Sequence, residues 1–126
     1  MLMLHHAERL KDVDPRLVQL AVHVGSLRDL IVIEGARSLE AEQQAIAGGF
    51  SSLTNPMDSK HVIDPPTRPL ALAIDLAPWP LDWKDLGEFD NLAVAMKLAA
   101  AELDIPVVWG GDWHTFKDRP HYELEG

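Results

Sequence analysis

The chain contains no cysteine. This absence excludes disulfide bridges, thiolate nucleophiles and zinc sites built from cysteine. Any transition metal bound by this protein must therefore be held by histidine and carboxylate side chains. The six histidines and twenty acidic residues of the sequence supply ample candidates.

The sequence also lacks an excess of positive charge and a long apolar run. Its formal net charge is −9, which argues against nucleic acid and anionic membranes as partners, because Lys and Arg dominate both interactions. No apolar stretch approaches the ~20 residues of a membrane-spanning helix. The first residues do not read as a secretory signal. We therefore expect a monomer that is made in the cytoplasm and needs a separate export route for any work outside it.

Three common catalytic motifs are missing or incomplete. The helical zinc motif HExxH is absent. Ser59, His61 and Asp75 have the residue types of a hydrolase triad, but no G-x-S-x-G motif accompanies them. Gly110-Gly111 is not followed by the Lys-Ser/Thr pair of a phosphate-binding loop. These three chemistries are therefore only weakly supported.

The length and composition predict a single globular domain over residues 1–126. A hydrophobic share of 47% and a charged share of 25% are ordinary values for such a domain. The chain is long enough to bury a core but too short for two domains. No repeat, low-complexity tract or linker interrupts it.

Local sequence signals predict three helices. Asp14 and Pro15 fit the N-cap and first position of a helix that runs to about residue 27. Ser38 caps a second helix that Gly48-Gly49 ends. The apolar spacing of residues 86–103 predicts the third and strongest helix.

The remaining segments predict strands and one long loop. Enrichment in β-branched and apolar residues predicts strands at 30–35, 71–76, 105–111 and 121–124. Prolines and turn-forming residues predict an extended loop over residues 50–70. Together the elements indicate an α+β fold, with a small, mostly antiparallel sheet and helices packed on one face.

Four polar residues stand out from this framework. Asp75 lies within an apolar strand, where an unpaired carboxylate is costly. His61 lies in the long loop, His121 begins the last strand, and Asp118 comes three residues before His121. Each has a structural alternative, since lone histidines are usually structural or solvated and lone aspartates usually cap or turn the chain.

Together these residues have the composition of a catalytic zinc site. Two imidazoles and one carboxylate supply three ligands and leave a fourth position for water. The metal lowers the pKa of that water toward ~7, and a further carboxylate then takes its proton. Asp118 suits this role, and the sheet edge is the expected place for the site.

Three segments carry a resemblance to a known family. SKH (59–61), ALAID (71–75) and WGGDWHTFKDRPHYEL (109–124) resemble motifs of the zinc D-alanyl-D-alanine carboxypeptidase and L-alanyl-D-glutamate endopeptidase family. Compact phage-type members of that family serve as endolysins. The segment EGARSLEAEQQAIAGG (34–49) also resembles the strand, arginine and helix of the family.

The resemblance implies roles for individual residues. It makes His61, Asp75 and His121 the zinc ligands and Asp118 the catalytic base. It also places Arg37 beside the substrate carbonyl, where a fixed cation would stabilise the developing oxyanion. The structural alternative for Arg37 is an ion pair with one of two nearby acids, Glu40 or Glu42. Three further residues are candidates for supporting the ligands or contacting substrate: Ser59, Asp112 and Trp113.

The sequence departs from the family pattern at two places. Ala71 replaces a glycine, and the spacing from His61 to Asp75 (75 − 61 = 14) is about twice the usual one. The extra residues at 62–70 contain three prolines, which predict an ordered flap on the rim of the cleft without a zinc ligand. In this interpretation Asp64 and Arg68 face solvent or substrate.

These observations predict a zinc-dependent peptidoglycan peptidase that cuts stem peptides. The leading interpretation is an L-alanyl-D-glutamate endopeptidase acting as a phage endolysin, released to the cell wall by a separate permeabilising protein. One alternative is a D,D-carboxypeptidase acting on D-Ala-D-Ala termini. Another is a non-catalytic, metal-bound cell-wall binding module, against which the presence of Asp118 argues.

Overall fold

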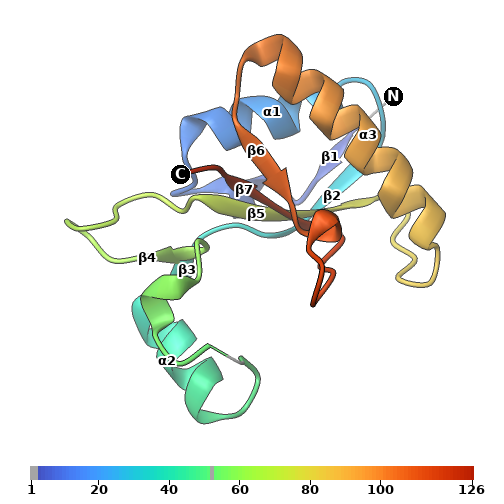
Figure 1. The fold of residues 1–126 in the computed structure, drawn as a ribbon. Coiled ribbons are helices and arrows are strands. Elements are labelled where there is room, and N and C mark those ends of the chain that lie inside the picture. The colour runs from blue at the N-terminus through green and yellow to red at the C-terminus, as the bar shows by residue number, and fades with distance from the viewer. Residues whose placement is uncertain (1–2, 52) are drawn as a thin grey trace.

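A five-stranded sheet forms the centre of the molecule in the computed structural model, which describes residues 3–51 and 53–126 (Figure 1). The strand order is β1-β2-β5-β7-β6. All neighbouring strands are antiparallel except the pair β1 and β2. The strands are β1 (Leu4–His5), β2 (Leu30–Glu34), β5 (Ala73–Pro78), β6 (Val107–Trp109) and β7 (His121–Leu124).

Two helices, α1 (Pro15–Gly25) and α3 (Leu86–Leu103), cover one face of this sheet (Figure 1). Each begins where an aspartate side chain accepts a hydrogen bond from a backbone N–H of the first turn, Asp14 in α1 and Asp85 in α3. Their apolar faces meet strand side chains in one core, which includes Leu17, Leu20, Ile74, Leu76, Leu92, Met96 and Tyr122. The α+β fold predicted from the sequence is confirmed.

The remaining helix, α2 (Leu39–Ala47), lies away from the sheet face (Figure 1). It packs beside a short two-stranded sheet of β3 (Arg37–Ser38) and β4 (Val62–Ile63), and beside the 3-10 helix η2 (Pro56–Asp58). We call residues 37–63 the α2 lobe. The prediction that the helices share one face therefore holds for α1 and α3 but not for α2. The physical reason is that Glu42 is the buried residue of α2, so this helix offers no apolar stripe to the sheet.

Most predicted elements appear within a few residues of the expected positions. Ser38 caps α2 by accepting a hydrogen bond from the Ala41 N–H (3.0 Å), and α2 ends before Gly48 as expected. The strand predicted at 105–111 is shorter, because Gly110–Asp112 form a 3-10 helix, η3. The other short 3-10 helix, η1 (Ala7–Leu10), follows β1. No helix within residues 3–51 and 53–126 is long and apolar enough to cross a membrane.

The inserted segment after His61 forms an ordered hairpin. Asp64 and Arg68 exchange backbone hydrogen bonds of 2.7 and 2.8 Å. The Arg68 guanidinium donates to the carbonyl oxygens of Ser59 (2.8 Å) and Met57 (3.1 Å). The expectation that Arg68 faces solvent or substrate was therefore wrong: its charge is used to tie the hairpin to the preceding loop.

Candidate metal centre

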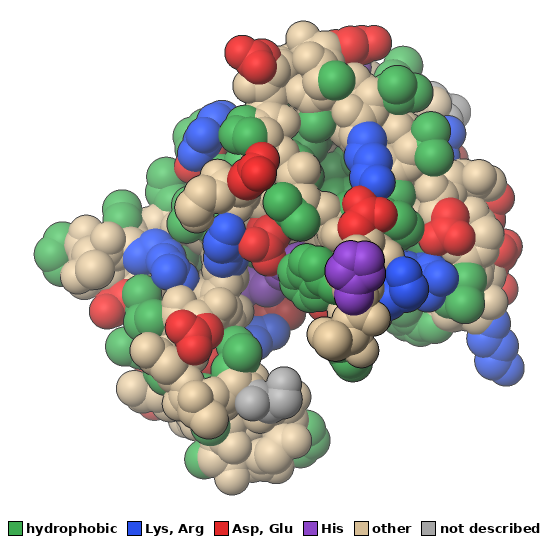
Figure 2. Space-filling model, in the orientation of Figure 1, with side chains coloured by type: hydrophobic (Ala, Val, Ile, Leu, Met, Phe, Trp, Pro, Cys, Tyr) green, Lys and Arg blue, Asp and Glu red, His purple; other side chains and the backbone are tan. Residues whose placement is uncertain are grey.

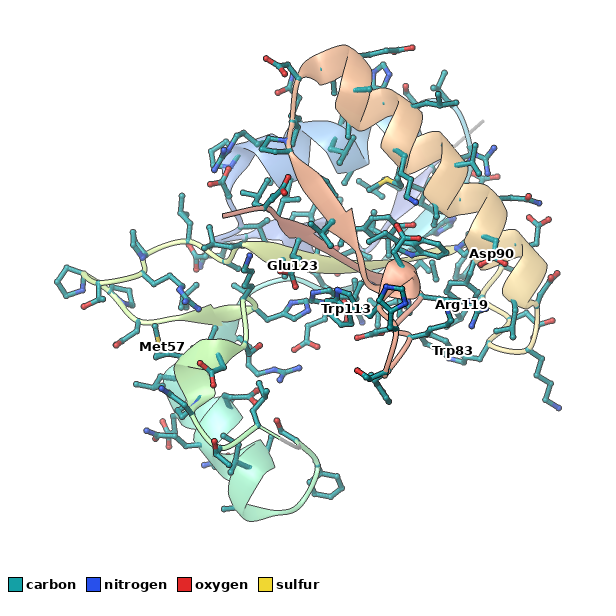
Figure 3. The ribbon with its side chains drawn as sticks, in the orientation of Figure 1. Met57, Trp83, Asp90, Trp113, Arg119 and Glu123 are labelled. Atoms are coloured by element: carbon teal, nitrogen blue, oxygen red, sulfur yellow. The ribbon has the colours of Figure 1, made fainter. Side chains whose placement is uncertain are left out.

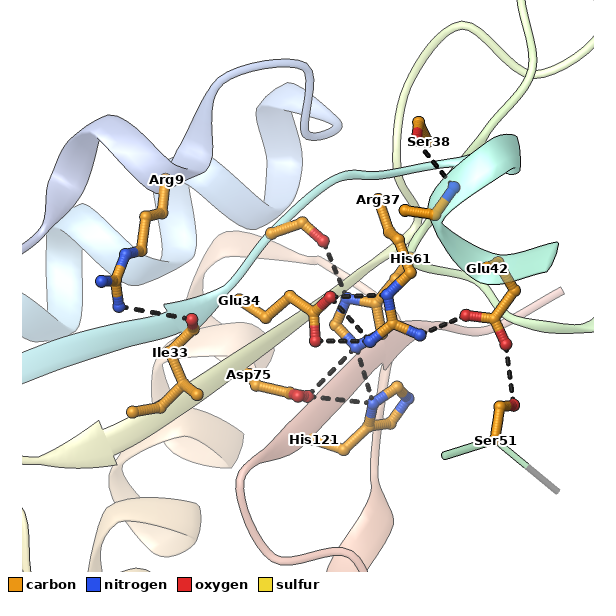
Figure 4. A network of polar contacts seen from close by, with 12 residues as sticks. Arg9, Ile33, Glu34, Arg37, Ser38, Glu42, Ser51, His61, Asp75 and His121 are labelled. Atoms are coloured by element: carbon orange, nitrogen blue, oxygen red, sulfur yellow. Dashed lines mark hydrogen bonds and ion pairs between the residues drawn. The ribbon is translucent and has the colours of Figure 1, made fainter. Parts of the chain in front are cut away.

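The side chains of His61, Asp75 and His121 converge over the face of the central sheet that α1 and α3 leave uncovered (Figure 4). Asp75 lies on the middle strand β5 between two core residues, Ile74 and Leu76. The site therefore lies on a face of the sheet and not at its edge, where the sequence predicted it. Asp75 on β5 lies directly opposite His121 on β7 in the strand register. His61 comes from the α2 lobe, immediately before β4. Its Nε2 atom lies 3.2 Å from Asp75 Oδ1 and 3.3 Å from His121 Nδ1, and His121 Nδ1 lies 3.2 Å from the same Asp75 oxygen.

These three atoms have the spacing of ligands around one zinc ion. Zinc–nitrogen and zinc–oxygen bonds of about 2.0–2.1 Å in a tetrahedron separate neighbouring ligand atoms by roughly 3.3–3.4 Å. The observed sides of 3.2, 3.2 and 3.3 Å match that triangle closely. The donor set of two imidazoles and one carboxylate therefore fits a catalytic zinc ion and leaves a fourth position for water.

Hydrogen bonds on the outer nitrogens orient both imidazoles. His61 Nδ1 lies 2.8 Å from the Gly35 carbonyl oxygen, which can only accept, so this nitrogen carries a proton and Nε2 is the nitrogen that a metal would bind. His121 Nε2 lies 2.8 Å from Glu123 Oε1, which leaves Nδ1 free for a metal. Glu123 is itself held by Lys60 Nζ at 2.9 Å. Such outer partners are typical of metal-ligating histidines.

The three side chains also shift one another's protonation. Burial would raise the pKa of Asp75, but hydrogen bonds from His121 and His61 outweigh it and hold the pKa well below its usual range. Burial would lower the pKa of His121, yet Asp75 and Glu123 raise it to about 9. Without a metal, the centre therefore holds an ionised carboxylate between imidazoles that favour protonation. A metal ion must displace those protons to bind.

Asp118 lies on the wall of the same cavity. This cavity of about 390 Å³ is lined by the three candidate ligands together with Asp118, Arg37, Trp113 and Phe116. Burial and the negative charge of Asp75 raise the pKa of Asp118. A carboxylate with a raised pKa beside a candidate metal site is suited to accept and return a proton.

A close backbone approach positions both Asp118 and His121. The Asp118 N–H donates to the Gly110 carbonyl (3.0 Å), and the His121 N–H donates to the Asp118 carbonyl (3.2 Å). A Cβ atom at Gly110 would lie 2.3 Å from the Asp118 carbonyl oxygen, so only glycine fits there. The Trp109 indole N–H also donates to the Arg119 carbonyl (2.7 Å). The WGG segment thus fixes the turn that carries Asp118 and His121.

Comparison with known proteins shows the family of this chain. Residues 2–125 match the family model described as phage L-alanyl-D-glutamate peptidase. The chain belongs to this family. It is 33% identical over 116 residues to the L-alanyl-D-glutamate peptidase of Escherichia phage T5, an alignment that covers 88% of this chain and 80% of the relative.

A solved structure shares the fold of this family member. The crystal structure of the Serratia marcescens L-Ala D-Glu endopeptidase ChiX superimposes with a TM-score of 0.75 at 30% sequence identity. The similarity covers 94% of this chain and 84% of the ChiX chain. The resemblance noted from the sequence motifs is confirmed, and the peptidases among these relatives are named for the L-alanyl-D-glutamate bond.

Arg37 lines the cavity and also forms the kind of ion pair that was its structural alternative. Its side chain lines the cavity of the metal centre and also forms ion pairs with Glu34, at 2.7 and 2.6 Å, and with Glu42 (Figure 4). Glu42 is fully buried and accepts a further hydrogen bond from the Ser51 hydroxyl (2.8 Å). The predicted alternative, an ion pair with Glu40 or Glu42, is thus confirmed for Glu42. The ion pair with Glu34 was not predicted.

The three candidate supporting residues have different positions. Trp113 lines the cavity, and its ring centroid lies 5.1 Å from that of His121. Ser59 also lines the cavity. Asp112 does not: its exposed carboxylate pairs with Lys97 Nζ at 2.7 Å, outside the cavity. The expectation that Asp112 lies near the reacting groups is corrected, because the η3 turn directs its side chain toward α3.

The inserted hairpin is also absent from the cavity wall. The lining residues on that side come from the loop before His61, with Leu53, Asp58 and Ser59 among them, and none comes from residues 62–70. The predicted flap is therefore ordered but does not form the cavity rim. Figure 2 shows the hollow between the α2 lobe and the rest of the molecule, with histidine atoms recessed in it.

Two residues that hold the candidate metal ligands in place were missed from the sequence. Glu123 holds His121, and Lys60 holds Glu123. The signal for Glu123 was available, because residues two apart on a strand share one face. Lys60 carried no comparable signal, since the contact joins the loop at 60 to the last strand through the tertiary fold.

Proposed function

We propose that residues 1–126 form a single zinc-dependent peptidase domain that hydrolyses the bond between L-alanine and D-glutamate in peptidoglycan stem peptides. The observation that carries this proposal is the triangle of His61, Asp75 and His121 donor atoms, with its zinc-like sides of 3.2–3.3 Å. The bond named for the phage T5 and Serratia relatives supports the choice of substrate.

Each residue of the centre has a defined task in this reaction. A bound zinc ion supplies Lewis acidity, which makes hydroxide available near neutral pH and polarises the scissile carbonyl. Asp118 accepts the proton of the attacking water and returns it to the leaving amine of D-glutamate. Arg37 presents a fixed positive charge to the cavity, where it stabilises the oxyanion of the tetrahedral intermediate. Glu123 and the Gly35 carbonyl hold the two imidazoles in their ligating tautomers.

The biological setting that fits this chemistry is lysis by a phage endolysin. The enzyme accumulates in the cytoplasm of the infected cell and reaches the wall after a separate protein has permeabilised the membrane. Its partner is then the stem peptide of bacterial peptidoglycan, and neither nucleic acid nor membrane takes part. The charge of −9 fits this assignment.

Mass analysis of digested peptidoglycan tests the proposal. Zinc-loaded protein should release stem peptides that begin with D-glutamate and leave L-alanine on the glycan. Release of terminal D-alanine instead would identify a D,D-carboxypeptidase, and absence of any cleavage by zinc-loaded protein would leave a binding module. The Asp118→Asn variant serves as the inactive control in the same digestion.

A further inference from the structure

The segment that links β5 to α3 exposes two tryptophans. Trp79 is 41% exposed and Trp83 is 52% exposed. They stand at the two ends of the sequence Trp79-Pro80-Leu81-Asp82-Trp83, and Leu81 between them is also exposed. Neither indole lines the cavity of the metal centre, so the proposed hydrolysis does not explain them.

Each of these indoles is supported on one face by another ring. Trp83 stacks on the buried Phe89, with ring centroids 5.6 Å apart and planes at 16°. Trp79 stacks on His5, with centroids 3.9 Å apart and planes at 25°. Because one face of each indole is covered while the side chain stays about half exposed, the opposite face is open to a ligand. Rings held in this way lose little conformational entropy on binding.

Hydrogen-bonding groups surround Trp79. It lines two hollows, of about 630 and 240 Å³, and Glu88 lines both of them. Arg28 and Asn91 border the larger hollow, and Asp82 and Asp85 border the smaller one. Flat aromatic faces beside carboxylate, amide and guanidinium groups match a sugar, whose C–H faces stack on rings and whose hydroxyl and acetamido groups hydrogen-bond. The acidic residues disfavour an anionic lipid surface.

Three contacts, linked by residues close together in the sequence, lead from the candidate metal centre to this surface. Trp113 lies against His121, and the turn that carries His121 also carries Arg119. The Arg119 guanidinium pairs with Asp90 on α3 at 3.1 Å, and the neighbouring Phe89 supports Trp83. Figure 3 shows Trp113, Arg119 and Trp83 along the same edge of the molecule.

We propose that Trp83 and Trp79 bind the glycan strand of peptidoglycan beside the catalytic cavity. This inference rests on the proposed function. In peptidoglycan the L-alanine of the stem peptide is joined directly to the glycan, so cleavage after L-alanine requires a sugar within one residue of the metal centre. Trp83 takes the sugar nearer the scissile bond, and Trp79 takes one farther along the strand. The two residues are four apart, so their Cα atoms lie within about 14 Å of each other.

Binding to glycan alone gives the direct test. The probe is a soluble oligosaccharide of N-acetylglucosamine, which carries the hydroxyl and acetamido groups of the glycan and no carboxylate. The chain has four tryptophans, so an NMR titration follows four indole N–H signals. The signals of Trp79 and Trp83 should shift, whereas that of Trp109, whose N–H is bonded to the Arg119 carbonyl, should not. Unchanged signals of Trp79 and Trp83 at saturating oligosaccharide would overturn the proposal.

Cleavage assays separate this surface from the catalytic centre. Trp83→Ala should lower kcat/KM on intact peptidoglycan by about 3- to 10-fold, mainly through KM, and should leave cleavage of a sugar-free L-alanyl-D-glutamyl peptide unchanged. Trp83→Leu, which keeps an apolar cover over Phe89 but lacks a flat face, should give the same pattern. Phe50→Ala, at a 90% exposed aromatic in the α2 lobe, is the matched control and should change neither rate.

The outcomes distinguish this proposal from the proposed function. Equal losses on both substrates in the Trp83 variants would assign Trp83 to the fold or the peptidase centre and overturn the glycan surface. The proposal would also be overturned if the wild type were a dimer and Trp83→Ala dissociated it. The exposed tryptophans would then bind a second copy of the chain and not the glycan. If the wild type cleaves neither substrate, the proposed function fails, while the NMR titration still decides whether the glycan binds.

Discussion

At the scale of single residues, the proposed function assigns metal binding and proton transfer to different side chains of one cavity. His61, Asp75 and His121 supply the three converging donor atoms, and Asp118 stands apart from them on the cavity wall. Because of this division, one substitution can abolish proton transfer while another abolishes metal binding. The two aspartates also differ in pKa: hydrogen bonds from the two histidines outweigh burial and depress the pKa of Asp75, whereas burial and the charge of Asp75 raise the pKa of Asp118.

Replacement of Asp118 tests the proton-transfer role. Asp118→Asn should keep the fold and the zinc content but lower kcat by at least ~10²-fold, because general acid–base catalysis is worth ~10²–10⁴-fold. Zinc analysis and cleavage rates measured on the same sample check this. His121→Ala, by contrast, should lose the metal as well. Near-normal activity in Asp118→Asn would assign the proton transfer to another group.

Arg37 requires a paired design, because its charge also compensates the buried Glu42. Arg37→Ala should lower kcat by ~10²-fold and also destabilise the fold by about 3 kcal/mol, the typical cost of leaving a buried charge unpaired. The double variant Arg37→Met/Glu42→Gln removes that charge and should recover most of the stability but not the rate. Urea unfolding measures the stability of this double variant, and peptide cleavage measures its rate. If both recover, Arg37 has only a structural role as the ion-pair partner of Glu42.

At the scale of elements, local signals predicted most helices and strands, because caps and apolar spacing act within a few residues. Asp14 and Ser38 cap helices as expected. Local signals could not predict the position of α2. That position depends on the contacts of the buried Glu42 side chain, one of which is the hydrogen bond from the Ser51 hydroxyl. The sequence motifs predicted the candidate metal residues, because those residues stand at recognisable spacings. The contact of Lys60 with Glu123 and the ion pair of Arg37 with Glu34 could not be predicted, because no local sequence signal indicates either of them.

The junction of β6 and η3 gives a prediction at this scale. Gly110→Ala should displace the turn at 118–121, because the new methyl group would lie 2.3 Å from the Asp118 carbonyl oxygen. We expect weaker zinc binding, measured by chelator competition, together with a lower Tm. Gly87→Ala in α3 is the matched control, since its nearest neighbour would be the Asp85 side chain at 3.7 Å. Equal zinc affinity in both variants would contradict the positioning role of Gly110.

At the scale of the whole molecule, the charge state of the centre links metal binding to stability. In the metal-free protein the pKa of His121 is raised to about 9. This raised pKa adds to the free energy of unfolding. The contribution is full when the pH is below ~6.5, the pKa of histidine in the unfolded chain, and it is lost as the pH rises toward 9. Zinc binding has the opposite dependence, because it requires neutral imidazoles and is favoured by higher pH.

Thermal unfolding with and without zinc measures this linkage. Between pH 6 and pH 9 the chelated protein should lose about 1–3 kcal/mol of stability from His121. The increase in Tm caused by added zinc should grow over the same range. An increase in Tm that is independent of pH would show that the bound metal does not displace protons from these imidazoles. The His121→Ala variant is the control, and zinc should change its Tm little at any pH.

The central claim is that one zinc ion binds between the α2 lobe and the face of the central sheet that α1 and α3 leave uncovered. Elemental analysis of protein purified with zinc in excess measures this most directly, with the wild type compared with His61→Ala and His121→Ala. The account predicts one zinc per chain in the wild type and in Asp118→Asn, and a loss of bound zinc in both histidine variants. A wild type without zinc, or histidine variants that retain the full amount, would contradict it.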